Sequence, residues 1–455
     1  MRKLVFFSSL ATIVGLAFCC VGYSAESSSP TTAPIPLSLK EAVERGLKES
    51  LRVQKVEAEQ EGAEAASSKA WSSFYPRLDL NASAGTFHDR LPNPGETTIP
   101  SVARDRNNYS GELVLTQNLF AGFGDWAGVS AANSARQAKK TKLASEKIKV
   151  TEQIVELYFG IQMLVKQIEA EQEATVFRET QLSDVQARFR AGAATELDRL
   201  QAEYMVKSQK PLFAELNSEL ELKLLHLARL LSFDLDARFN LTDSLESASS
   251  VLESAQVPSL ADAFKVALTQ NLDIAKLASE IDHYNEESRK IEAKHLPQLD
   301  LKLAVGNNAY LRQEIATQSA LTYSGQLVLN VPLFSALSSL DERRERAAGF
   351  TALRRQRALL REKLLDDLDA AYHTWKLSLT RIESENANVS LAQEAARRAR
   401  VGLKSGRVAP TDALNYYNQL IQAKKNLAKA MYDRIVSLSK IRTLLGKPYL
   451  LSPSR

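Results

Sequence analysis

Four short segments of the chain alternate between apolar and polar residues. Residues 78–84 (LDLNASA) and 299–305 (LDLKLAV) place an apolar side chain at every second position, and so, with more interruptions, do 109–119 and 323–331. Side chains of a β-strand point to opposite faces in turn, so a period of two predicts a strand with one apolar face. We therefore expect four strands, arranged in two consecutive pairs.

In the long segments that follow each strand pair, apolar residues recur with a different period. Residues 125–190 contain no proline, and Val150, Ile154 and Leu157 begin a series of apolar residues spaced alternately by four and three. This spacing is typical of a helix with a coiled-coil seam. Residues 337–404 repeat it. At 1.5 Å per residue, a helix of about 66 residues spans roughly 100 Å.

A shorter helix is expected before each strand pair. Ser38 and Ser259 each have an acidic residue three positions later, which is the spacing of a helix capping box. Each helix should run for about 35 residues and end before Pro76 or Pro297, because the residue before a proline disfavours the helical conformation. These two prolines therefore mark helix-to-strand joints.

The chain contains the same unit twice. FYPRLDL at 74–80 corresponds to HLPQLDL, 221 positions later, and GELVLTQNLF at 111–120 corresponds to GQLVLNVPLF, 214 positions later. The seven-residue difference between these offsets fits a loop of variable length. Each unit is predicted to be helix, strand, strand, long helix, turn and returning helix. The chain is thus divided into a first repeat at 37–232, a linker at 233–257, a second repeat at 258–446 and a tail at 447–455.

Residues 1–24 have the features of a secretory signal. Two basic residues precede an apolar stretch, and small residues near Ala25 suit a cleavage site. A retained membrane anchor is the alternative. Cys19 and Cys20 lack the small residue that precedes a lipidated cysteine, so lipidation is not expected. Because both cysteines of the chain lie in this stretch, we expect no disulfide and no cysteine-based site in the exported part.

Charge and hydropathy exclude two classes of protein. The 58 basic and 54 acidic residues are nearly balanced, and no basic block suggests a nucleic-acid partner. Beyond residues 1–24, no apolar run approaches the 18 residues of a membrane-spanning helix.

Four strands are also too few to close a membrane barrel, for which about eight is the minimum. Oligomerisation would solve this problem, since three chains supply twelve strands.

The order, spacing and duplication of these elements resemble the TolC family of outer-membrane efflux proteins. The PLF at 332–334 and the turn glycines, each followed six residues later by an aspartate, carry the resemblance. It implies a mixed, mainly α fold: a trimeric twelve-stranded outer-membrane β-barrel continuous with a long periplasmic α-helical barrel. It also implies an exit duct for a tripartite efflux pump, with a periplasmic adaptor protein, an inner-membrane pump and outer-membrane lipid as partners.

The resemblance implies a periplasmic gate at the helix turns. Asp412 takes the position of an acidic ring at the tunnel entrance, and the position of a second acid is occupied by Asn415. Asp198 is the equivalent acid of the first turn, with Arg199 and Arg407 as candidate partners. First-turn acids favoured by the helix dipole are the alternative explanation.

Five further residues are expected to shape these turns and contribute to adaptor docking. A glycine suits the left-handed conformation at a helix end, and a proline suits the first turn of a new helix. Residues preceding the returning helices complete the set. They are Gly192, Thr195, Gly406, Ala409 and Pro410.

Aromatic residues gather around the predicted strand ends. They form either an interfacial membrane belt or a packing cluster between barrel and tunnel. The glycines of GFGDWAG at 122–128 do not have dinucleotide-binding spacing, and we interpret them as a bend between strand and helix. The aromatic residues are Trp71, Phe74, Tyr75, Phe120, Phe123 and Trp126.

Nothing in the sequence indicates an enzyme. The five histidines are scattered without metal-ligand spacing, and no activated nucleophile can be identified, so we expect no cofactor and no metal site. Two alternatives to the efflux duct remain. One is the same duct serving type I protein secretion. The other, of a different class, is a soluble periplasmic coiled-coil tether, which the four alternating strands disfavour.

Overall fold

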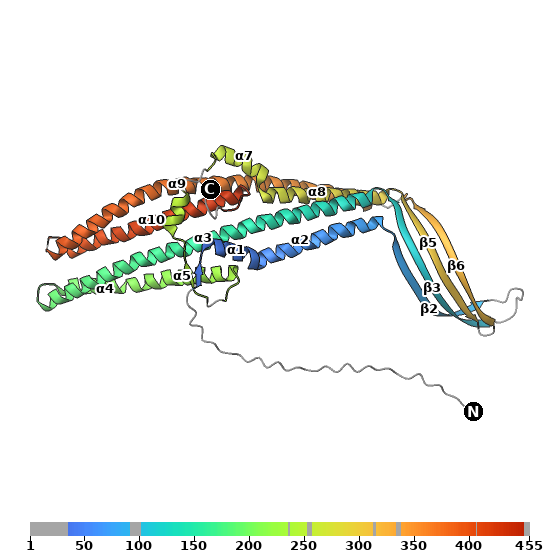
Figure 1. Ribbon diagram of the computed structural model, residues 1–455, viewed down its shortest axis with the longest axis horizontal. Helices are drawn as coiled ribbons and strands as arrows, with labels where there is room; N and C mark the ends of the chain where they lie inside the picture. Colours follow the sequence, from blue (N-terminus) through green and yellow to red (C-terminus); the bar gives the residue numbers. More distant parts are fainter. Residues whose placement is uncertain are drawn as a thin grey trace, which may run out of the picture.

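The molecule is elongated, with a β-sheet at one end and long helices that run from it to two turns at the other end (Figure 1). The computed structural model describes residues 35–91, 102–234, 237–252, 257–312, 315–333, 338–405 and 407–449. The expected signal at 1–24, Gly406, and parts of the linker and tail lie outside these residues.

The helices display the duplication directly. A shift of 221 residues converts the bounds of α1 into those of α7, and a shift of 214 converts α3 into α9. The linker contains α6 (Leu245–Val251). The first repeat contains α1 (Leu39–Glu49), α2 (Leu51–Ala70), α3 (Gly124–Arg190), α4 (Glu196–Lys207) and α5 (Gln209–Leu230). The second contains α7 (Leu260–Gln270), α8 (Leu272–Glu292), α9 (Ser338–Lys404) and α10 (Pro410–Leu444).

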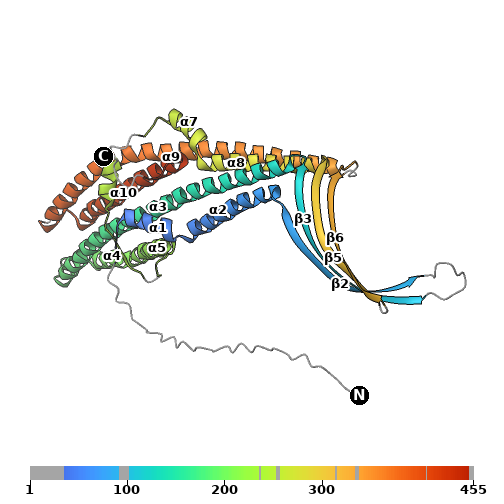
Figure 2. The same ribbon diagram turned by 45° about the vertical axis from the view of Figure 1, so that its right-hand side comes forward.

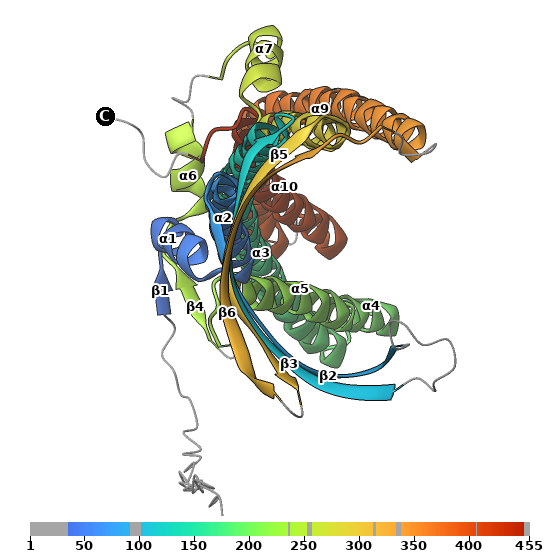
Figure 3. The ribbon, with the colours of Figure 1, turned by 90° about the vertical axis from the view of Figure 1, so that its right-hand side faces the viewer.

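All four predicted strands are present, and each extends further than its alternating pattern. They are β2 (Arg77–Leu91), β3 (Val102–Ala121), β5 (Gln298–Arg312) and β6 (Ile315–Asn330), in the antiparallel order β2-β3-β5-β6. The sheet is strongly curved (Figures 2 and 3). Within the described residues, β2 and β6 are its two unpaired edges.

The helix-to-strand joints lie at Pro76 and Pro297, as predicted, each after a short 3₁₀ turn. The predicted aromatic residues do pack together at the first joint. The Trp126 ring lies 4.9 Å from the Phe74 ring and 6.2 Å from the Trp71 ring, and Phe120 contacts Phe123. All of these rings except Phe74 remain largely exposed, so a membrane belt stays a prediction.

The glycines of GFGDWAG form the expected bend. Gly122 has φ +59°, and a Cβ there would lie 2.6 Å from the Leu296 Cβ and 2.8 Å from the Ala293 carbonyl oxygen. Phe123 is also left-handed and forms the N-cap of α3. The backbone therefore turns sharply from β3 into α3.

The prediction of one unbroken 35-residue helix before each strand pair was wrong. The helices break at Ser50 and Asn271, which are extended and become the N-caps of α2 and α8. The Asn271 side chain accepts hydrogen bonds from the backbone N–H groups of Asp273 and Ile274, so a local cap competes with helix continuation. The returning helix of the first repeat also breaks, at Ser208, because Pro211 has no N–H to continue the ladder.

The core lies around the middle of α3, where the predicted seam is buried. Val150, Ile154 and Tyr158 are fully buried against helices of both repeats. A two-stranded parallel sheet that was not predicted lies here, formed by β1 (Ile35–Leu37) and β4 (Phe239–Leu241). The linker is thus fixed to the helical region.

Candidate functional site at the helix turns

Two helix turns lie side by side at the end of the molecule farthest from the sheet (Figures 1 and 2). One joins α3 to α4 and the other joins α9 to α10. Nearly all of the sequence-predicted functional residues lie here; Pro76 and Pro297 are at the opposite end of the helices.

The first turn is a Schellman motif centred on Gly192. This glycine has φ +72°, its N–H donates to the Phe189 carbonyl oxygen, and the Ala193 N–H donates to the Arg188 carbonyl oxygen at 2.8 Å. Both bonds satisfy carbonyl groups at the end of α3. The second turn has the equivalent bond from the Arg407 N–H to the Gly402 carbonyl oxygen, also at 2.8 Å.

The helix after the first turn begins with a capping box. The Asp198 carboxylate accepts hydrogen bonds from the Thr195 hydroxyl at 2.6 Å and the Thr195 N–H at 2.9 Å. In return, the Asp198 N–H donates to the Thr195 hydroxyl at 3.1 Å. These bonds lower the pKa of Asp198, with the hydroxyl as the larger cause. Asp198 therefore fixes the start of α4.

The helix after the second turn begins differently. Ala409 is its N-cap, has no side chain that can accept a hydrogen bond, and is followed by Pro410 at the first helical position. Asp412 is exposed, and within the described residues its carboxylate has no hydrogen bond or ion pair. Asn415 is exposed three residues further on. The second turn thus presents an unoccupied carboxylate.

The arginines predicted as partners of Asp198 do not pair with it within one chain. Arg199 donates to Glu196 and to Glu203, the latter at 3.1 Å, so its guanidinium is held on its own helix. Arg407 is exposed in the second turn. The Asp198 carboxylate is already bound by the capping box, and Arg199 is held by carboxylates three and four positions away on its own helix.

A groove of about 400 Å³ separates the two turns. Its lining includes Asp198 and Met205 from α4, and Pro410 and Leu414 from α10. Beside it, the rings of Phe177 and Tyr417 stack at 4.0 Å with an interplanar angle of 2°. The two hairpins therefore contact one another through a small apolar cluster but remain separated at their tips.

A buried ionic cluster that sequence analysis missed joins the hairpins above the groove. The Glu171 carboxylate of α3 accepts from Lys425 of α10 at 2.9 Å and lies 3.9 Å from the Arg178 guanidinium. Arg178 also donates to Asn418 at 2.7 Å. Glu171 and Arg178 are seven residues apart, so they share a helix face; this spacing was the one available signal.

Nothing in the described part of the chain suggests a metal centre or a helical membrane span. No group of three or more histidine, cysteine or acidic side chains there could hold a metal ion. No helix in that part is both long and apolar enough to cross a membrane.

Comparison with known proteins matches this architecture. The family model of outer membrane efflux proteins matches residues 42–232 and 263–447. The chain is 24% identical to the alkaline protease secretion protein AprF of Pseudomonas aeruginosa over 75% of this chain and 70% of that protein. It is 22% identical to the outer membrane protein TolC of Vibrio cholerae over 86% of each chain.

Solved structures show the same fold. The Campylobacter jejuni CmeC outer membrane channel superposes with a TM-score of 0.77 at 17% identity, covering 90% of this chain and 85% of that one. The CusC structure gives a TM-score of 0.76 at 16% identity and covers 92% and 96% of the two chains. The chain therefore belongs to the outer membrane efflux protein family and is an outer-membrane channel protein.

Proposed function

We propose that three copies of this chain form one duct across the periplasm and the outer membrane. The observation that carries the proposal is the open sheet, whose edges β2 and β6 are unpaired within the described residues. Exposed strand edges are normally covered, and a closed barrel removes them altogether. Four strands per chain give a twelve-stranded barrel from three chains.

The exposed apolar side chains of the sheet support a membrane location for this barrel. Leu78, Leu80, Leu327 and Leu329 each expose at least 60% of their surface. A row of exposed leucines on a sheet is costly in water but suits the lipid-facing side of a barrel.

The helices supply the rest of the passage. α3 and α9 each contain 67 residues, which corresponds to roughly 100 Å of helix. We place the turns at the periplasmic end, with Asp412 and Asn415 at the entrance and Asp198 holding the neighbouring turn. Three exposed Asp412 carboxylates around a narrow opening would attract cations and repel anions.

The turns are also the proposed docking site for a periplasmic adaptor protein of an inner-membrane pump. Gly192 and Pro410 fix the shape of the two tips, and Thr195 and Ala409 complete the described part of the surface. Gly406, expected in the same role, lies outside the described residues. The groove between the tips offers the partner both apolar and charged groups. In this proposal the substrate of the duct is that of the pump.

Type I protein secretion is a second candidate for the same duct. Two curated relatives, AprF of Pseudomonas aeruginosa and PrtF of Dickeya chrysanthemi, are named as protease secretion proteins. Co-purification separates the candidates: a secretion duct is expected to retain the adaptor of a peptide-exporting ATPase, and an efflux duct that of a drug pump.

Conductance and stoichiometry test the proposal together. The purified protein in detergent should have the mass of three chains by light scattering. In a planar bilayer it should give a small, stable single-channel current. A well-folded trimer without conductance would contradict the duct and favour the periplasmic tether.

A further inference from the structure

A second groove lies at the opposite end of the helices, where they meet the sheet. We call it the joint groove; it has a volume of about 540 Å³, which falls within the roughly 300–1,000 Å³ of small-ligand sites. Its lining comes from the start of α3, from the last part of α8 and the residues that follow it, and from Arg343 of α9. The gate and the adaptor contact proposed above make no use of it.

The joint groove opens on the side of the molecule that carries the exposed leucines of the sheet. Phe120 of β3 pairs with Leu299 of β5, which pairs in turn with Leu329 of β6. Directly opposed residues of paired strands place their side chains on one face, so Phe120 lies on the apolar face. Its ring lies 5.3 Å from the ring of Phe123, which lines the groove. The groove therefore continues the apolar face of the sheet towards the helices.

The part of the joint groove nearest to the sheet is apolar. Phe123 and Trp126 expose 67% and 57% of their surface there, and Leu296 is also exposed. Neighbouring apolar side chains that remain exposed mark a contact with lipid or with another apolar partner. Aromatic rings in particular suit the boundary between hydrocarbon and headgroups. This part of the groove fits the glycerol and upper acyl portion of a lipid.

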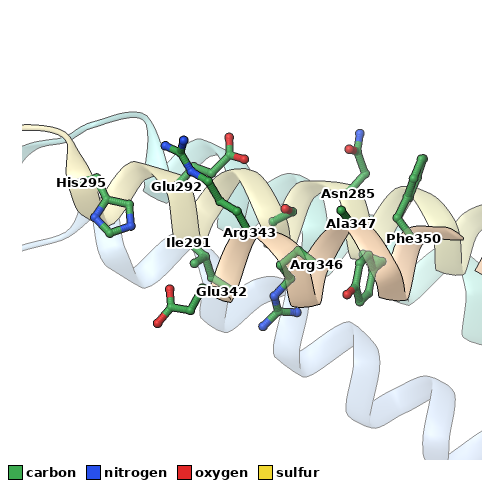
Figure 4. A pocket seen from close by; sticks show the side chains of 11 residues that line it. Asn285, Ile291, Glu292, His295, Glu342, Arg343, Arg346, Ala347 and Phe350 are labelled. Carbon is green, nitrogen blue, oxygen red and sulfur yellow. The ribbon is translucent and has the colours of Figure 1, made fainter. Parts of the chain in front are cut away.

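Further from the sheet, the joint groove contains two opposite charges that do not neutralise each other. Arg343 and Glu292 are both exposed, and neither forms an ion pair within the described residues. Figure 4 shows the two side chains on the same side of the α8–α9 pair, whereas Glu342 and Arg346 point the other way. A guanidinium that can bind a phosphate and a carboxylate that can bind an ammonium group therefore lie in one groove.

We propose, on the basis of the membrane location put forward above, that the joint groove binds one phospholipid whose headgroup carries both a phosphate and a primary ammonium group, as an ethanolamine phospholipid does. Arg343 donates to the phosphate, and a ring nitrogen of His295 supplies a second donor. Glu292 accepts hydrogen bonds from the ammonium group. The acyl chains lie over Phe123 and continue along the leucines of the sheet.

The balance of charge in the groove favours this class of headgroup. The lining contains two arginines and two glutamates, and Arg289 is already held by Glu286 at 2.7 Å. A headgroup with a phosphate and no cation would bring a negative charge next to the free carboxylate of Glu292, which is unfavourable. A choline headgroup carries a cation but has no N–H group to donate. An ethanolamine headgroup satisfies both free groups.

The equivalent joint of the first repeat has no such charges. A shift of 221 residues relates Glu292 and His295 to Trp71 and Phe74, whose rings pack with Trp126. A shift of 214 relates Arg343 to Val129, which is buried. Packed apolar side chains thus occupy the first joint. Within the described residues, only the second joint combines an apolar surface with free charges.

Lipid binding to the purified protein tests the proposal. Native mass spectrometry in detergent would be used to titrate ethanolamine, choline and glycerol phospholipids that have identical acyl chains. We expect the parent to bind the ethanolamine lipid about two- to five-fold more tightly than the other two. Arg343→Ala should weaken all three by about ten-fold, because each has the phosphate. Glu292→Gln should weaken the ethanolamine lipid alone and so remove the preference.

Arg344→Ala is the matched control. Arg344 is the next residue along α9, is exposed, lies outside the lining of the joint groove and pairs with Asp341 at 3.4 Å. This variant should bind all three lipids as the parent does. Circular dichroism should show the same helix content in every variant, since the altered side chains are exposed.

The outcomes separate this proposal from the duct. Equal losses in Arg343→Ala and Arg344→Ala would show a general attraction of cations to phospholipid and would overturn the site. A preference for ethanolamine that persists in Glu292→Gln, or no preference in the parent, would overturn the headgroup assignment. Either result in a protein that conducts in a planar bilayer leaves the proposed duct standing. A well-folded parent that neither conducts nor binds phospholipid would overturn both.

Discussion

The two helix turns share an equivalent backbone hydrogen bond but differ in their side-chain chemistry. Thr195 and Asp198 of the first turn correspond to Ala409 and Asp412 of the second, 214 residues later. Thr195 binds the Asp198 carboxylate through its hydroxyl and its N–H. Ala409 has no hydroxyl, and Pro410 supplies the rigid start of the helix instead.

This difference separates two acids that look equivalent in the sequence. The Asp198 carboxylate is occupied by the cap, so its main role is to hold the turn. The Asp412 carboxylate is exposed and has no partner within the described residues. The acid has the same position in both repeats, but only the first repeat places a hydroxyl beside it.

Removal of Glu171 should reduce stability more than any other change, because its ion pair with Lys425 connects the α3–α4 hairpin to the α9–α10 hairpin. Glu171→Ala leaves Lys425 and the mostly buried Arg178 without their carboxylate. We expect a loss of about 3 kcal/mol in the free energy of unfolding, measured by urea titration of helical circular dichroism. Glu173→Ala is the matched control: its pair with Lys424 is more exposed and should contribute at most about 1 kcal/mol.

The next largest loss of stability is expected when the residues that follow the two returning helices, Ser232 after α5 and Gly446 after α10, are exchanged. Gly446 and Ser232 occupy equivalent left-handed positions, with φ +70° and +52°. Gly446→Ser should cost about 2 kcal/mol, since its Cβ would also lie 2.5 Å from the Gln270 carbonyl oxygen. Ser232→Gly should change stability by less than about 0.5 kcal/mol, because relief of strain is offset by loss of the hydroxyl bond to Glu49. Thermal unfolding of both variants measures this asymmetry.

Thr195→Ala should make the first turn resemble the second. Loss of the capping hydroxyl is expected to cost about 1 kcal/mol. Because the bonds from Thr195 lower the pKa of Asp198, their contribution is present above the unfolded-state pKa of about 3.9 and is lost as pH falls through the lower folded-state value. The variant should therefore lose less stability between pH 5 and pH 2 than the parent. An equal loss in both would contradict the assignment, and Thr195→Ser should behave like the parent.

Ala409→Thr should have the smallest effect and act in the opposite direction. A threonine at this N-cap can bind the Asp412 carboxylate as Thr195 binds Asp198. We expect a gain of at most about 1 kcal/mol in urea unfolding. The gain should disappear when Asp412→Ala is added, and a gain that persists would show that the cap does not engage Asp412.

Periodicity and spacing predicted most of the fold. The strands, the long helices, the joints at Pro76 and Pro297 and the positive φ of Gly192 were all evident as local patterns. The breaks at Ser50 and Asn271 were not, because an N-cap inside an apolar helical pattern leaves the pattern unchanged. The β1–β4 sheet escaped because three residues are too few to show alternation.

The location of both acids at the helix turns was predicted, and their role as a gate stays a prediction. Their different environments depend on Thr195 alone, and no sequence pattern indicates the importance of this residue. The Glu171–Lys425 pair joins residues 254 positions apart. Its partners are ordinary charged residues on long helices, so only the packing of α3 against α10 distinguishes them.

The most direct test of the account compares cation block in two variants. Single-channel current would be recorded in a planar bilayer while a trivalent cation is added on the side of the helix turns. We expect Asp198→Ala to be blocked at the same concentration as the parent. Asp412→Ala should need at least about ten times more cation, because three unpaired carboxylates are lost. Equal block in the parent and Asp412→Ala, or relief of block by Asp198→Ala, would contradict the claim that the free acid of the second turn guards the entrance.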